Sequence, residues 1–182
     1  MSKVCVFFAT GFEEIEALTV VDILRRASID VDMVSITDDK KVTGSHNITV
    51  EMDKLFKEVD FDSIDMLVLP GGMPGTKNLE AFEPLMDKID DFYNKGKYIA
   101  AICAAPSIFG HKGILKGKKA CSYPTFESHL EGADVTKEPS VVDGKVITGR
   151  GMGTAIPFAL TILKELKGDN EAASMKEKIV FN

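Results

Sequence analysis

Short apolar runs alternate with longer segments that carry apolar residues at helical spacing. The apolar runs predict buried strands at residues 3–9, 31–36, 65–69, 97–102, 119–123 and 145–148. Helical spacing predicts helices at residues 13–28, around 78–94 and at 154–166, followed by a short helical tail. Strands that alternate with helices are typical of a parallel sheet covered on both faces. We therefore expect an α/β sandwich with three layers and a mainly parallel central sheet.

Two further segments predict hairpins. Residues 42–50 are rich in β-branched and turn residues, and Asp143-Gly144 lies between two short apolar runs as a hairpin turn. No internal repeat, low-complexity tract or linker divides the chain, and 182 residues suit one domain. We expect residues 1–182 to form a single domain.

Composition narrows the class of protein. The net charge of −6 and the absence of a basic run argue against nucleic acids and anionic membrane surfaces as partners. The apolar runs are shorter than the roughly 18 residues that span a bilayer, and residues 4–9 are too short for a signal peptide. Cys5, Cys103 and Cys121 form no CxxC pair, so we expect neither disulfides nor a metal cluster. A chain without disulfides suits a reducing compartment, and we expect a cytoplasmic location.

Cys103 is the first candidate for chemistry. It follows the apolar run of residues 99–102 and precedes Ala104-Ala105-Pro106, as in a strand that ends in a sharp turn before a helix. Pro106 suits the first turn of that helix, and a thiol near a helix N-terminus is favoured as the reactive thiolate. The alternative is a small buried cysteine that fills the end of a strand. The pattern leaves both interpretations open.

Three glutamates begin the first predicted helix. Glu16 shares a helical stripe with the apolar Val20 and Ile23, which places its carboxylate near the buried side and the carboxyl edge of the sheet. Burial would raise its pKa and make it a proton carrier beside the thiol. The alternative is that Glu13, Glu14 and Glu16 complement the helix dipole, and for Glu14 we favour that interpretation.

A glycine pair follows the strand at 65–69. The backbone N–H groups of Gly72 and Ala104 could together bind a developing oxyanion. Taken alone, the Pro70-Gly71-Gly72 segment indicates only a turn.

The chain resembles the ThiJ/PfpI superfamily, and more narrowly the branch of the parkinsonism-associated protein deglycase and bacterial YajL-like proteins. The resemblance lies in four segments, residues 11–16, 68–72, 100–106 and 149–154. It implies a flavodoxin-like homodimer without a cofactor, in which a protonated Glu16 is hydrogen-bonded to Cys103. It also implies cofactor-independent detoxification of dicarbonyls: a glutathione-independent glyoxalase that converts methylglyoxal to lactate, or a deglycase that removes early adducts from glycated amines and thiols.

The chain departs from that family pattern at the site. Many relatives place a histidine where this chain has Tyr123, and often an arginine where it has His46, so these two residues are accessory candidates. Glu13, one helical turn before Ala17 on the same stripe, is a third. An alternative function is a redox-responsive protective or chaperone protein whose cysteine oxidises to the sulfinate, with little catalysis. Ala104 argues against the peptidases of the superfamily, which have a histidine there. We interpret His129-Leu130-Glu131, which spells the His-x-Glu pair of amide transfer, as chance.

Overall fold

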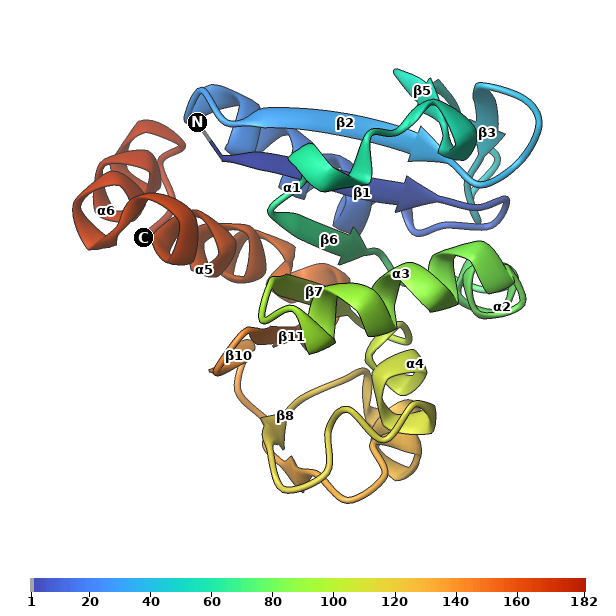
Figure 1. Ribbon diagram of the computed structural model, residues 1–182. Helices are drawn as coiled ribbons and strands as arrows, with labels where there is room; N and C mark the ends of the chain where they lie inside the picture. The colour runs from blue at the N-terminus through green and yellow to red at the C-terminus, as the bar shows by residue number, and fades with distance from the viewer. Residues whose placement is uncertain (1) are drawn as a thin grey trace.

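A central sheet of seven strands has the order β10-β11-β7-β6-β1-β2-β5 in the computed structural model, which describes residues 2–182 (Figure 1). The strands are β1 (Lys3–Phe8), β2 (Asp30–Ser35), β5 (Lys54–Leu55), β6 (Met66–Leu69), β7 (Tyr98–Ile102), β10 (Ser140–Asp143) and β11 (Val146–Gly149). Every neighbouring pair is parallel except β10 with β11. The predicted mainly parallel sheet is confirmed.

Helices cover both faces of this sheet. One face holds α1 (Glu14–Arg26), α5 (Ala155–Lys167) and α6 (Asp169–Lys178), and the other holds α2 (Gly75–Glu80), α3 (Glu83–Asn94) and α4 (Pro106–His111). Figure 1 shows α3 in front of the sheet and α1 behind it. Side chains of β1 alternate between the two cores, with Val4 and Val6 on one side and Cys5 and Phe7 on the other. Both faces are covered, which explains why the strand is apolar throughout.

Two predicted elements differ from the structure. The helix expected around residues 78–94 is broken into α2 and α3, because Phe82 leaves the helical conformation and Pro84 lies in the first turn of a new helix. The strand expected at 119–123 is only β8 (Lys119–Ala120), which pairs with β9 (Asp134–Val135) outside the main sheet. Pro124 then starts a 3-10 helix, η3 (Pro124–His129).

Both predicted hairpins are confirmed. The first pairs β3 (Lys41–Thr43) with β4 (Thr49–Glu51), and the second is β10 with β11. The remaining short elements are the 3-10 helices η1 (Phe56–Glu58), η2 (Phe61–Ser63) and η4 (Met152–Thr154).

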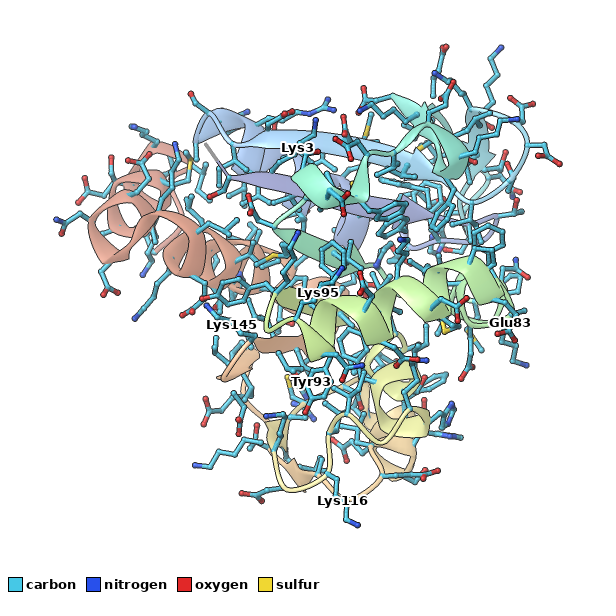
Figure 2. The ribbon with its side chains drawn as sticks, in the orientation of Figure 1. Lys3, Glu83, Tyr93, Lys95, Lys116 and Lys145 are labelled. Carbon is cyan, nitrogen blue, oxygen red and sulfur yellow. The ribbon has the colours of Figure 1, made fainter. Side chains whose placement is uncertain are left out.

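The carboxyl ends of the adjacent strands β1, β6 and β7 meet at one edge of the sheet. Ligands bind at this edge in open α/β sheets. Charged side chains such as Glu83, Lys95 and Lys116 project outward from the surface elsewhere (Figure 2). Within residues 2–182 no helix has the length and apolar character to cross a membrane.

Candidate active site

Cys103 lies in a sharp turn between β7 and α4. Its φ of 66° is in the left-handed region, which a residue with a side chain rarely adopts. Its N–H donates to the carbonyl of Gly149 at 3.0 Å, and its own carbonyl accepts from Tyr123 N–H at 2.8 Å. Hydrogen bonds on both sides hold the strained residue in place. The predicted elbow at the end of the strand is confirmed.

Glu16, in the first turn of α1, lies against this turn. Its side chain is fully buried, and Oε2 accepts the N–H of Gly71 at 2.9 Å. Oε1 has no hydrogen-bond partner among residues 2–182, and among side chains the thiol of Cys103 has the largest effect on the pKa of this carboxyl. Burial raises the pKa of Glu16 to about 7, while the hydrogen bonds from Cys103 and Gly71 lower it by less. The prediction of a desolvated carboxylate beside the thiol is confirmed.

The expectation of a free thiolate is corrected. Burial raises the pKa of Cys103, and so does the charge of Glu16, whereas the N–H groups of Ala104 and Gly72 lower it by less. Burial and the neighbouring carboxylate thus favour the thiol form of Cys103, and burial favours the protonated form of Glu16. The start of the short helix α4 does not offset the removal of the sulfur from water.

A cavity of about 390 Å³ opens above the pair. Its lining residues are Glu13, Glu16, His46, Gly72, Met73, Cys103, Ala104, Tyr123, Phe126 and Met152. Every candidate site residue from the sequence lies in this lining. The structure adds three apolar side chains, Met73, Phe126 and Met152, which stand in loops and short 3-10 helices where no periodic pattern marks them.

Glu14 has a role that the sequence analysis missed. Its buried carboxylate accepts the backbone N–H of His46 at 2.8 Å and contacts Nδ1 of the same residue at 2.9 Å. Burial raises the pKa of Glu14, but these hydrogen bonds outweigh burial and hold that pKa below its usual range. The hydrogen bond that Nδ1 of His46 donates to the Glu14 carboxylate raises the pKa of His46. Glu14 thus anchors the loop between β3 and β4 over the cavity mouth.

The same residues could approach a metal ion. Glu13, Glu14 and His46 bring one ligand atom each within 4.8 Å of one another. Both oxygens of Glu14 already accept hydrogen bonds from the loop, so we interpret the group as an ion-pair network.

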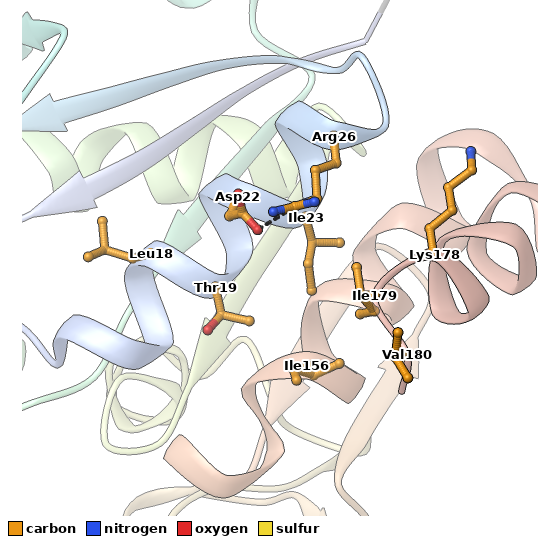
Figure 3. Close-up of a pocket in the computed structure, with 9 residues that line it drawn as sticks. All are labelled: Leu18, Thr19, Asp22, Ile23, Arg26, Ile156, Lys178, Ile179 and Val180. Carbon is orange, nitrogen blue, oxygen red and sulfur yellow. Dashed lines mark hydrogen bonds and ion pairs between the residues drawn. The ribbon is translucent and has the colours of Figure 1, made fainter. Parts of the chain in front are cut away.

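A second cavity, of about 530 Å³, lies between α1, α5 and the end of α6 (Figure 3). Its lining is largely aliphatic, and Asp22 and Arg26 form an ion pair of 2.7 Å at its rim. No cysteine, histidine or buried carboxylate lines it. The Cys103 cavity is therefore the candidate active site.

Comparisons with known proteins identify the family of this chain. The sequence pattern of the DJ-1/PfpI family matches residues 2–165. Protein DJ-1 homolog B of Arabidopsis thaliana is 36% identical over 181 residues, which cover 98% of this chain and 41% of the relative. The chain therefore spans about two-fifths of that relative's length.

Two further similarities extend over nearly the whole of both proteins. The protein called glutathione-independent glyoxalase DJ-1 of Schizosaccharomyces pombe is 32% identical over 176 residues, which cover 91% of this chain and 92% of the relative. The structure of oxidized DJ-1 of Toxoplasma gondii superposes with a TM-score of 0.95 at 33% identity, covering 100% of this chain and 99% of that one. The central sheet and its flanking helices thus form a flavodoxin-like sandwich, and the chain belongs to the DJ-1/PfpI family.

Proposed function

We propose that the protein converts small 2-oxoaldehydes such as methylglyoxal to 2-hydroxy acids without a cofactor. The observation that carries the proposal is the thiol of Cys103 on a strained turn beside the fully buried Glu16, whose pKa is about 7. A group with a pKa near the working pH both accepts and returns protons efficiently. The name of the Schizosaccharomyces pombe relative supports this reaction class.

The first step is the attack of Sγ of Cys103 on the aldehyde carbon. Glu16 accepts the thiol proton as the carbon–sulfur bond forms, and then returns it to the alkoxide oxygen, giving a hemithioacetal. The N–H groups of Gly72 and Ala104, which face the sulfur, stabilise the negative charge on that oxygen. The raised pKa of the thiol makes this proton transfer necessary.

The second step moves hydrogen between the two carbons of the substrate. Glu16 removes the proton from the former aldehyde carbon and delivers it to the neighbouring ketone carbon by way of an enediol. The hydroxyl proton of the first carbon passes to the oxygen of the second, so one carbon is oxidised and the other reduced. The product is a thioester of lactate on Cys103. Water hydrolyses this thioester, releases lactate and restores the thiol. Atoms and electrons balance without an external oxidant or reductant.

The same chemistry extends to early glycation adducts. Such adducts are hemiaminals and hemithioacetals, which release the free aldehyde together with the original amine or thiol, and the aldehyde then follows the same two steps. The cavity is at the small end of the usual range of ligand pockets, roughly 300–1,000 Å³, which favours a small dicarbonyl. Glu13, His46 and Tyr123 line the cavity around the substrate, as accessory groups. We also propose that the protein is cytoplasmic, which cell fractionation would check. We propose that it is a homodimer, which light scattering would check.

The test is lactate formation from methylglyoxal. We expect C103A to abolish it and E16Q to lower kcat by about 100-fold or more, as loss of a proton carrier does. C121S is the matched control, because Cys121 is equally a cysteine but lies buried against Thr148, away from the cavity. Full activity in C103A would overturn the proposal.

A second candidate function is protection through oxidation of the same thiol. Cys103 is partly exposed, whereas Cys5 and Cys121 are buried, and the relative from Toxoplasma gondii was solved oxidized. Under mild peroxide this function gives a mass increase of about 32 Da, two oxygen atoms, on Cys103 alone. Selective oxidation together with negligible lactate formation would favour this second function over the first.

A further inference from the structure

Two of the three histidines in the chain meet on a surface outside the Cys103 cavity. His111 ends α4 and His129 ends η3, and Nε2 of His111 lies 3.1 Å from Nδ1 of His129. The two rings are nearly perpendicular, at 77°. On the other side of His111, its Nδ1 lies 2.6 Å from Oε1 of Glu80, the last residue of α2.

The backbone segments that carry the two histidines are in direct contact. Gly110, next to His111, packs so closely on the carbonyl of His129 that a Cβ at this position would overlap it. The ring of Phe126 lies beside that of His129, with 5.7 Å between the centroids. The ends of α4 and η3 are therefore in direct contact, and the two imidazoles start from neighbouring backbone positions.

The chemistry of the trio is that of a metal ligand set. A metal-bound histidine usually donates its second ring N–H to a carboxylate, which fixes the tautomer and the orientation of the ring. Glu80 is placed to accept from Nδ1 of His111, so Nε2 of His111 accepts the hydrogen bond from Nδ1 of His129. A metal ion would take the place of that shared hydrogen once His129 carries its proton on Nε2 instead. Imidazole nitrogens suit zinc, copper and nickel ions. Two nitrogens at about 2.1 Å from a tetrahedral ion lie about 3.4 Å apart, close to the separation of these two.

The surroundings leave the trio open to a cation. His111 and His129 are exposed, so small rotations bring both lone pairs toward one point and water can complete the coordination. Lys112, the nearest lysine along the chain, pairs instead with Asp90 at 2.8 Å. We propose that His111 and His129 bind a divalent transition-metal ion of the zinc or copper class, with Glu80 as the residue that orients His111.

The proposal is tested by titrating the full chain with Zn²⁺ in a calorimeter. We expect one equivalent bound, a loss of at least tenfold in affinity in H111N and in H129N, and a loss of about 10- to 100-fold in E80Q. H46N is the matched control, since it changes the third histidine, and C103S excludes the accessible thiol; both should bind as the wild type does.

Two further measurements separate a bound ion from an effect on folding. Zn²⁺ should raise the Tm of the wild type but not that of H129N, because only a ligand of the folded state stabilises it. Cu²⁺ should give an electron spin resonance spectrum with two nitrogen ligands, and H129N should reduce it to one. Absence of binding to the wild type, binding unchanged in H111N and H129N, or binding lost in H46N or C103S would each overturn the proposal.

Discussion

The backbone N–H of Gly71 donates a hydrogen bond of 2.9 Å to Oε2 of Glu16, and joins the end of β6 to the first turn of α1. A Cβ on residue 71 would lie 2.6 Å from Cβ of Cys103 and 2.7 Å from that same carboxylate oxygen. The glycine is thus required for close approach of three chain segments. The interpretation of Pro70-Gly71-Gly72 as only a turn was incomplete.

The substitution G71A should therefore damage the site. The added methyl group must separate Cys103 from Glu16, and a displacement of about 1 Å in such a pair can cost about 100-fold in rate. We expect kcat/KM for methylglyoxal to fall by about that factor. G153A is the control, because no atom lies within 4 Å of a Cβ built on Gly153. Equal loss in both variants would contradict the argument.

The rate should depend on pH through Glu16. Its carboxylate must be ionised to accept the thiol proton, and burial places its pKa at about 7. We expect kcat/KM to rise from pH 6 and to level off above about 8. E16Q should remove this inflection. H46N should keep it, which separates Glu16 from the other titrating group whose pKa is raised at the cavity.

Stability should depend on pH in the opposite direction. The pKa of Glu16 is raised from 4.5 to about 7 in the folded protein, so its contribution to stability is full below pH 4.5 and is lost as the pH rises through 7. A difference of this size corresponds to about 3 kcal/mol. Urea unfolding at pH 4.5 and pH 8 should show this loss in the wild type and not in E16Q. The exposed change E83Q should leave the wild-type dependence intact.

Removal of Glu14 should loosen the cavity mouth. E14A removes the charged acceptor of the His46 N–H, and a hydrogen bond to a charged group contributes about 1.5–3 kcal/mol. We expect the free energy of unfolding to fall by that amount and KM for methylglyoxal to rise, since His46 lines the cavity. E51A, on the exposed strand β4 of the same hairpin, should change neither quantity. A KM unchanged in E14A would contradict a role for this loop in substrate binding.

Much of the site was predictable because the sheet follows from local pattern. Apolar runs that end in glycine, or in small residues before a proline, marked β6 and β7, and adjacent parallel strands must bring their carboxyl ends together. The helical stripe through Glu16 placed its carboxylate on the buried side of α1. The sequence therefore predicted that Cys103 and Glu16 lie close together, although it could not give the distance between them.

The remainder depends on contacts that no local pattern encodes. Glu14 neighbours two other glutamates, and only the return of the β3–β4 loop makes it an anchor for His46. The pKa of Cys103 follows from how completely the fold excludes water from the sulfur, which outweighs the nearby helix start. The contact between His111 and His129 depends on how η3 packs against α4.

Tyr123 offers a direct test of whether Glu16 makes the proton transfers alone. Its side chain is 47% exposed and lines the cavity, and a phenol with a pKa near 10 is a poor base at neutral pH. The reference pKa of a histidine side chain is near 6.5, so a histidine here would be able to share the proton transfers that Glu16 otherwise makes alone. We expect Y123H to raise kcat for methylglyoxal by about tenfold or more, the lower part of the range for an added acid–base group. Y123F should stay within about threefold of the wild type, because the hydroxyl carries no proton in the scheme. A large loss in Y123F would instead show that the phenol itself binds the substrate.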